Sequence, residues 1–216
     1  DAKDVAETKS VEETAERSAV AESSAEVTEF KPGDEVPAEA LAAGVDGFFS
    51  VKPIPDEVFS RMEGKTYKSN CTVPRSELRY IRCLHVDAKG RTLVGEMVLN
   101  QKIASKVLGI FRKLYDAGYP IEKMLLADNY GADDERIMTA NCTSAFNFRF
   151  VSGTRTVSKH GLGMAVDINP LYNPCKRTLK TGEVKVEPAA GNPYVDPAKK
   201  FDYKLEPGDL CHRLFK

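Results

Sequence analysis

Ser-Lys-His-Gly-Leu-Gly-Met-Ala-Val-Asp-Ile-Asn-Pro, at residues 158–170, is the most informative stretch of the chain. His160 is followed by glycines that allow a sharp turn, and residues 164–168 have the apolar character of a short buried strand. Asp167 lies inside that run, where a carboxylate must be paired, hydrogen-bonded or bound to a metal. Imidazole and carboxylate are both ordinary zinc ligands. The stretch therefore predicts two legs of a zinc site, although a His and an Asp at this spacing also occur by chance as surface groups.

The motif and its neighbours resemble one family of enzymes. Ser-x-His-x-x-Gly-x-Ala-x-Asp-Ile is similar to the signature of the zinc D,D- and L,D-peptidases of peptidoglycan, the D-Ala-D-Ala carboxypeptidase and VanY-like group. The resemblance extends to residues 141–149 and 167–174, and covers the chain from about Phe48 to its C-terminus. It implies an α+β domain, with a small antiparallel sheet and flanking helices, that hydrolyses amide bonds of peptidoglycan stem peptides.

The resemblance also implies roles for individual residues. His160 and Asp167 correspond to zinc ligands, and Ser158 corresponds to a serine that lies beside the substrate. Arg149 is the nearest counterpart of an arginine that polarises the scissile carbonyl. The implied reaction is amide hydrolysis in which Zn²⁺ activates water and Arg149 stabilises the developing oxyanion.

One part of the family's pattern is missing. The family's third zinc ligand is a His in an Asp-x-x-His setting after a Trp-Gly-Gly segment, in the region that also supplies the acidic general base. This chain contains no Trp. His212 is the remaining candidate, but its surroundings resemble a helix that precedes that segment. Because catalytic zinc normally has three protein ligands, we expect the chain to lack the third-ligand segment, to bind zinc poorly and to hydrolyse peptidoglycan slowly or not at all.

Charge divides the chain into two parts. Residues 1–45 carry 12 acidic and 4 basic residues, which leaves 20 acidic and 27 basic residues for the remainder, so the two parts have net charges of −8 and +7. The acidic part has few large apolar residues and is expected to be a disordered leader or linker, with a solvated helix over residues 11–27 as the alternative. Residues 46–216 are expected to form the peptidase domain, whose positive charge suits an anionic wall polymer.

The remaining composition constrains the setting. No apolar run is long enough to span a bilayer, and residues 1–216 contain no signal peptide pattern. The five cysteines form no Cys-x-x-Cys pair, so their pairing stays open. We expect a monomer, and the resemblance implies an enzyme outside the cell or at a bacterial cell envelope, with the leader as its tether.

Hydrophobic periodicity predicts the secondary structure. We expect helices over residues 56–62, 100–118, 133–138 and from 209 onward, and strands over 78–86, 92–99, 121–127 and 146–151. Asn100 and Asp209 are the expected caps of the second and last helices, and acidic residues are expected to begin the third. In the last strand Asn147 and Arg149 would share one face. His85 lies within the strand 78–86 and is expected to face solvent or a neighbour rather than a metal.

Two other functions stay open. A wall-binding module could keep this fold without hydrolysis, and a basic domain could bind nucleic acid, although no clustered Lys/Arg run supports the latter. The sequence does not support a thermolysin-like metalloprotease, a serine hydrolase or a nucleotide-binding protein. It contains no His-Glu-x-x-His helix, no Gly-x-Ser-x-Gly elbow and no Gly-rich phosphate loop.

Overall fold

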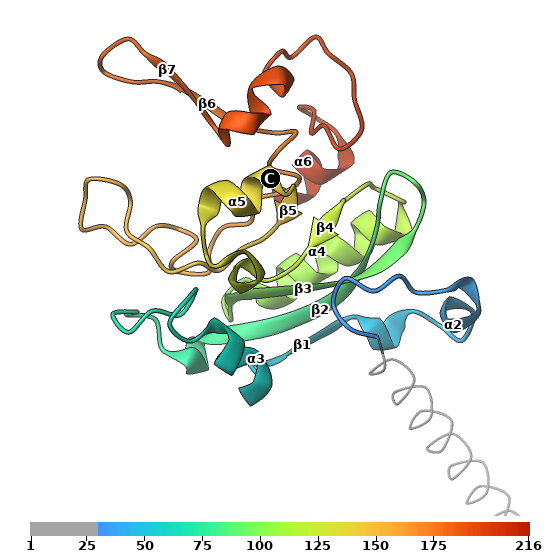
Figure 1. Cartoon of the computed structure of the whole chain (residues 1–216). Coiled ribbons are helices and arrows are strands. Elements are labelled where there is room, and N and C mark those ends of the chain that lie inside the picture. The colour runs from blue at the N-terminus through green and yellow to red at the C-terminus, as the bar shows by residue number, and fades with distance from the viewer. Residues whose placement is uncertain (1–29) are drawn as a thin grey trace, which may run out of the picture.

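The central element is a three-stranded antiparallel sheet, seen in a computed structural model that describes residues 30–216 (Figure 1). The strands β1 (Ser50–Pro53), β2 (Leu78–Val86) and β3 (Thr92–Asn100) lie in the order β1-β2-β3. Leu78 faces Asn100 and Val86 faces Thr92, so β2 and β3 form the predicted hairpin. Its turn at residues 87–90 is closed by a Gly90 N–H that donates to the Asp87 carbonyl.

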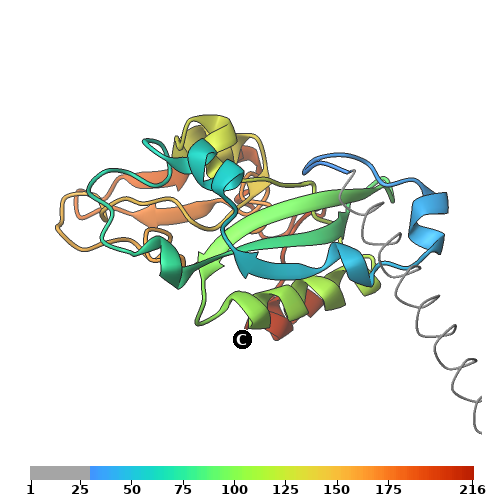
Figure 2. The ribbon, with the colours of Figure 1, turned by 90° about the horizontal axis from the view of Figure 1, so that it is seen from below.

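One face of the sheet is covered by helix α4 (Ala104–Asp116), with the last helix α6 (Leu210–Phe215) beside it (Figure 2). The apolar stripe of α4 is buried against β2 and β3, as its helical spacing predicts. Asn100, the expected cap of this helix, instead ends β3, and Ile103 occupies the N-cap position of α4. The predicted Asp209 cap of α6 is confirmed, because its side chain accepts from the His212 N–H at 2.7 Å.

The opposite face carries a second apolar cluster. Helix α3 (Asp56–Met62) packs there through Val58 and Met62, together with Phe146 and Phe148 from a later part of the chain. The expected strand 146–151 is wrong, because only Phe150 makes an isolated bridge, to Val157. Phe146 and Phe148 bury their rings in the core without a partner strand, so alternation of aromatic and polar residues reflects burial here rather than pairing.

Residues 30–45 belong to the folded domain, which corrects the expected boundary at residue 46. Gly33 and Val36 donate hydrogen bonds to the carbonyls of Val94 and Thr92, so this segment extends the sheet beyond β3. Val36 is 3 % exposed, and the short helix α2 (Ala38–Ala42) follows it. The rest of the expected leader, residues 1–29, lies outside the described residues.

The remaining elements are short. They are the 3-10 helices η1 (Asp46–Phe48), η2 (Arg75–Glu77), η3 (Ala127–Tyr130) and η4 (Ala189–Tyr194), helix α5 (Asp134–Thr139), the parallel pair β4 (Lys123–Met124) and β5 (Cys142–Thr143), and the antiparallel pair β6 (Cys175–Thr178) and β7 (Val184–Glu187). The strand expected over 121–127 is reduced to β4. The structure is therefore a mixed α+β fold with small sheets and short helices, as expected. Among residues 30–216, no helix is long and apolar enough to cross a bilayer.

His85 is buried on the α4 side of β2, where it faces a neighbour as expected. Its Nδ1 lies 2.7 Å from the carbonyl oxygen of Ile121. A carbonyl can only accept, so Nδ1 carries the hydrogen. Burial lowers the pKa of His85 from 6.5 to about 4, against the opposing effects of the Ile121 carbonyl and Asp87. His85 is therefore neutral at physiological pH.

This neutral histidine predicts acid sensitivity. The unfolded chain protonates His85 near pH 6.5 and the folded chain only near pH 4, so the stability that neutral His85 carries is present above pH 6.5 and is lost between these values. We expect this loss to reach about 2–3 kcal/mol between pH 7 and 4.5, measured by urea unfolding. His85→Gln keeps a donor for Ile121 and should remove that part of the slope, whereas His212→Gln should leave it. An unchanged slope in His85→Gln would contradict the assignment.

Candidate functional site

The structure brings His160 and Asp167 together. His160 Nε2 lies 3.3 Å from Asp167 Oδ2, and Nδ1 lies 2.8 Å from the carbonyl oxygen of Ala145. Because that carbonyl can only accept, Nδ1 carries the hydrogen and Nε2 is left facing Asp167. The Asp167 side chain is 42 % exposed, so the pair opens to solvent. An imidazole whose second nitrogen is held by a backbone carbonyl is the usual arrangement of a metal-binding histidine.

Backbone pairing fixes this geometry. Ser144 and Asp167 form an isolated antiparallel bridge with N···O distances of 3.1 and 2.9 Å in the two directions. The Asn147 N–H donates to the carbonyl of His160 at 3.3 Å. Residues 144–147 therefore hold both members of the pair. The expected buried strand over 164–168 is wrong, because only this bridge forms and Met164 and Asp167 are turned toward solvent.

The pKa of His160 depends on the charge of Asp167. Burial alone lowers the pKa of His160, but the hydrogen bond and charge of Asp167 and the carbonyl of Ala145 outweigh it, so the pKa is raised. Arg149 acts in the opposite direction and lowers the pKa of His160. Asp167 and Arg149 therefore both change the pKa of His160, in opposite directions.

Arg149 lies in an ion pair rather than on a strand face. Its Nε is 2.5 Å from Asp134 Oδ2, and Asp134 Oδ1 accepts from Asn147 Nδ2 at 2.9 Å. Asp134 is the first residue of α5, whose predicted acidic start is confirmed by the Asp133 cap. Asp134 thus connects the two polar side chains, Asn147 and Arg149, of the 146–151 segment.

Ser158 is buried in the turn that leads to His160. Its Oγ accepts a hydrogen bond from the Gly161 N–H at 2.9 Å, and its own N–H donates to the carbonyl of Arg149. The hydroxyl thus stabilises the turn, and its hydrogen is available for a further acceptor. This is a structural explanation of the serine in the motif, beside which its expected contact with substrate stays a prediction.

The motif's second glycine is required by a close approach. Gly163 has φ +66°, and a Cβ there would lie 2.7 Å from the backbone nitrogen of Asn100. The Asn100 N–H also donates to the carbonyl of Gly163 at 2.9 Å. The turn after His160 is therefore docked on the end of β3, at a contact that no side chain fits.

Gly163→Ala is expected to lower the free energy of unfolding by about 3 kcal/mol or more, because strain at positive φ adds to overpacking. Gly153→Ala is the matched control, since Gly153 has φ +74° and nothing within 4 Å of the added Cβ. It should cost roughly 1–2 kcal/mol from backbone strain alone. Equal losses in chemical denaturation of the two variants would show that the docking contact relaxes.

A complete metal site is not present in the described part of the chain. Among residues 30–216, no three His, Cys, Asp or Glu side chains gather closely enough to hold a metal ion. His212, the candidate third ligand, instead accepts from the Gly208 N–H through Nδ1 at 3.0 Å. It lines an apolar groove of about 610 Å³ beside Val166 and Ile168. Among the described residues, His160 and Asp167 could therefore supply two zinc ligands, and no third ligand lies close to them.

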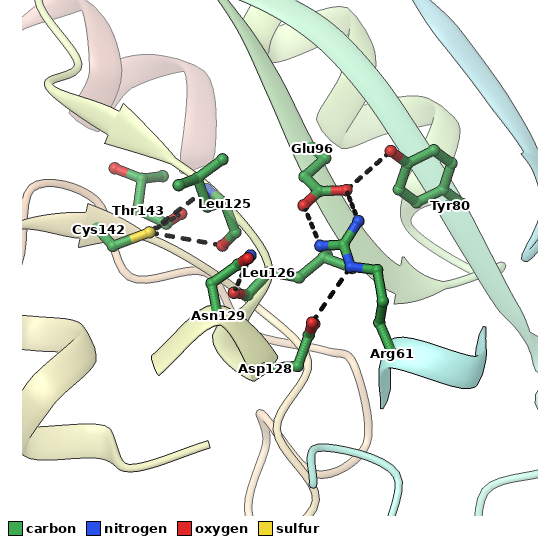
Figure 3. Close-up of polar contacts among 9 residues, drawn as sticks. All are labelled: Arg61, Tyr80, Glu96, Leu125, Leu126, Asp128, Asn129, Cys142 and Thr143. Carbon is green, nitrogen blue, oxygen red and sulfur yellow. Dashed lines mark hydrogen bonds and ion pairs between the residues drawn. The ribbon is translucent and has the colours of Figure 1, made fainter. Parts of the chain in front are cut away.

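A buried ion cluster was missed by the sequence reasoning (Figure 3). Arg61 of α3 lies between Glu96 of β3 and Asp128 of η3, with guanidinium–carboxylate distances of 2.6 and 3.4 Å. The Tyr80 hydroxyl donates to the same Glu96 at 2.8 Å. Glu96 and Asp128 are 1 % and 3 % exposed. The available signal was Glu96 itself, a charged residue within the apolar run of β3.

The five cysteines are free thiols. Cys83, Cys142 and Cys211 are buried, and burial raises their pKa values to about 12, 11 and 12. These three are therefore unreactive core residues.

Comparisons with protein-family models, with curated proteins and with solved structures find no match for the chain.

Proposed function

We propose that this protein is a zinc-dependent peptidase of the D-Ala-D-Ala carboxypeptidase and VanY-like type, acting on peptidoglycan stem peptides. The observation that carries the proposal is the approach of His160 Nε2 to Asp167 Oδ2, at 3.3 Å, with Nδ1 held by the Ala145 carbonyl. When bound, zinc would polarise the scissile carbonyl and activate water. The motif's resemblance to the peptidase signature supplies the substrate class, and with it a location outside the cell or at a bacterial envelope.

The chain's own residues have distinct parts in this proposal. The Ala145 carbonyl holds a hydrogen of His160 on Nδ1, so that Nε2 is the nitrogen that would bind the metal once its own proton has left. Asp134 orients Arg149, whose guanidinium would donate to the oxygen that becomes negative in the transition state. Ser158 shapes the turn and would offer its hydroxyl hydrogen to the substrate main chain.

A wall-binding module is the second candidate. It is favoured by one observation, the absence of a three-ligand group among the described residues. Such a module would use the same residues around His160 and Asp167 to hold a stem peptide without cleaving it. The net charge of +7 over residues 46–216 would assist both candidates on anionic wall polymers.

Release of muropeptides from purified peptidoglycan, with and without added zinc, separates the two candidates. Because the described residues supply only two zinc ligands, release is expected to be slow, but a peptidase still gives new amino termini that increase with zinc. Arg149→Lys should reduce this slow rate by roughly 100-fold, the size expected for an oxyanion donor. Arg155→Lys is the matched control on an exposed neighbouring arginine and should have no effect. Co-sedimentation with peptidoglycan without release would favour the binding module, and neither binding nor release would contradict both.

A further inference from the structure

The side chain of Asn147 attaches the segment that carries Arg149 to a distant part of the chain. Its nitrogen Nδ2 donates two hydrogen bonds, to the Ala132 carbonyl at 3.0 Å and to Asp134 Oδ1 at 2.9 Å. An amide nitrogen carries two hydrogens, so both are used. The side chain therefore connects this segment to the loop between η3 and α5 and to the first residue of α5.

The main chain of Asn147 reaches both His160 and Arg149. Its N–H donates to the His160 carbonyl at 3.3 Å, and its carbonyl oxygen accepts from Arg149 Nη1, also at 3.3 Å. Arg149 Nε pairs with Asp134 Oδ2 at 2.5 Å. The two main-chain bonds are long for N–H···O contacts, so the shorter bonds through Asp134 supply the stronger restraint on the guanidinium.

Asp134 differs from the carboxylate of an ordinary surface ion pair. The side chains of Arg149 and Asp134 are 30 % and 36 % exposed, and a pair of that exposure usually gains little free energy because water competes for both partners. Here Asp134 is bonded through both oxygens, Oδ1 to Asn147 and Oδ2 to Arg149. These two bonds fix its orientation, so a buried residue directs the position of Arg149.

Stability alone does not explain an asparagine at this position. Asn147 is 3 % exposed, and its oxygen Oδ1 is buried without a hydrogen-bond partner. A buried acceptor without a partner destabilises the fold. The carbonyl that accepts from Nδ2 belongs to Ala132, whose φ of +60° is uncommon for an alanine. Proteins carry such local costs chiefly at functional sites.

We propose that Asn147 is a positioning residue of this site, which fixes Arg149 beside the turn of His160 through Asp134. The inference rests on the proposed peptidase function for its effect on the reaction. Arg149 acts on the developing oxyanion, whereas Asn147 acts only through Arg149. Loss of Asn147 should therefore lower kcat and leave KM nearly unchanged, because a displaced guanidinium loses a contact made in the transition state.

Hydrogen exchange of side-chain N–H groups tests the geometry without catalysis. In the zinc-free ¹⁵N-labelled chain, Asn147→Ser should speed exchange at Arg149 Nε–H about tenfold, the equivalent of one hydrogen bond, because the serine hydroxyl is too short to hold Asp134. Asn129→Ser is the matched control, since Asn129 also donates to a carbonyl, that of Leu126 at 2.9 Å, and it should leave Arg149 unchanged. Unchanged exchange at Arg149 in Asn147→Ser would overturn the proposal.

Asp134→Ala keeps the proposal testable if Asn147→Ser does not fold, because Asp134 lies half-buried at the start of α5. Removing the shared carboxylate should speed exchange of one Asn147 Nδ2 hydrogen and of Arg149 Nε–H together. Faster exchange at Arg149 alone would show that Asn147 takes no part in holding the guanidinium, and would overturn the proposal.

A double-substitution cycle in muropeptide release tests the effect on the reaction. Asn147→Ser should lower kcat about tenfold when Arg149 is present, and less than about twofold in the Arg149→Lys background, where no guanidinium remains to be positioned. Equal losses in the two backgrounds would show a merely structural role and overturn the proposal. A wild-type chain that releases nothing would contradict the proposed peptidase, and the exchange experiment would still decide whether Asn147 holds Arg149.

Discussion

Replacing Arg61 with methionine is expected to lower the free energy of unfolding by about 3–5 kcal/mol, the usual cost of leaving buried charges uncompensated. The Arg61 guanidinium contacts both Glu96 and Asp128, which are almost fully buried. Burial already raises the pKa of Asp128, despite the attraction of Arg61. One Asp128 oxygen, Oδ1, also has no hydrogen-bond partner. Without Arg61, two buried carboxylates would be left without a countercharge.

Arg112→Met is the matched control for this experiment. Arg112 has nearly the same side-chain exposure as Arg61, 35 % against 37 %, and it also pairs with two carboxylates, Asp46 and Asp116. Those partners are 90 % and 52 % exposed, so water replaces the lost contact. Arg112→Met should cost about 1 kcal/mol or less. Similar losses for both arginines in urea unfolding would contradict the role assigned to burial.

A rescue experiment tests the same mechanism from the other side. Adding Glu96→Gln and Asp128→Asn to Arg61→Met removes both unpaired charges and keeps the side-chain shapes. The triple variant should recover part of the stability that Arg61→Met loses, because the penalty lies in the uncompensated charges rather than in the missing contact. No recovery would indicate that the packing of the Arg61 side chain carries the effect.

The second large effect concerns zinc. His160→Ala and Asp167→Asn are each expected to reduce zinc affinity at least about 100-fold, since even changes in residues that only support a metal ligand cost 10–100-fold. The reason is that His160 Nε2 and Asp167 Oδ2 face each other, and the described residues offer no third metal ligand beside them that could replace either one. Affinity is measured by competition with a chromophoric chelator.

His212→Ala and Asp196→Asn are controls of the same residue types on exposed positions, and both should leave zinc affinity unchanged. A large loss in His212→Ala would identify it as the third ligand, against its position in the structure. Zinc binding that survives in both His160→Ala and Asp167→Asn would place the metal elsewhere and contradict the proposed site.

Local signals in the sequence were sufficient for the β2–β3 hairpin and for helices α3, α4, α5 and α6. The β2–β3 hairpin and α4 follow their hydrophobic periods. Asp209 caps α6 as predicted, and acidic residues begin α5 as predicted. These elements were predictable because pattern and cap lie within one segment. The approach of His160 to Asp167 was anticipated from the glycines between them.

Non-local packing explains what the sequence did not reveal. Segments 146–151 and 164–168 have strand-like composition, but each forms only one isolated bridge, and composition does not specify a pairing partner. Residues 33–36 were assigned to a leader by charge, although a few backbone bonds and Val36 suffice to attach them to β3. The Arg61 cluster unites residues 61, 96 and 128, and no local pattern connects them.

Zinc coordination by His160 is tested most directly by long-range ¹H–¹⁵N spectra of the histidine rings during zinc titration. His160 Nε2 should change its chemical shift on zinc addition while Nδ1 stays protonated and bonded to Ala145, and Asp167→Asn should greatly weaken the response. Unchanged His160 nitrogens at saturating zinc, or coordination through Nδ1, would contradict the proposed site.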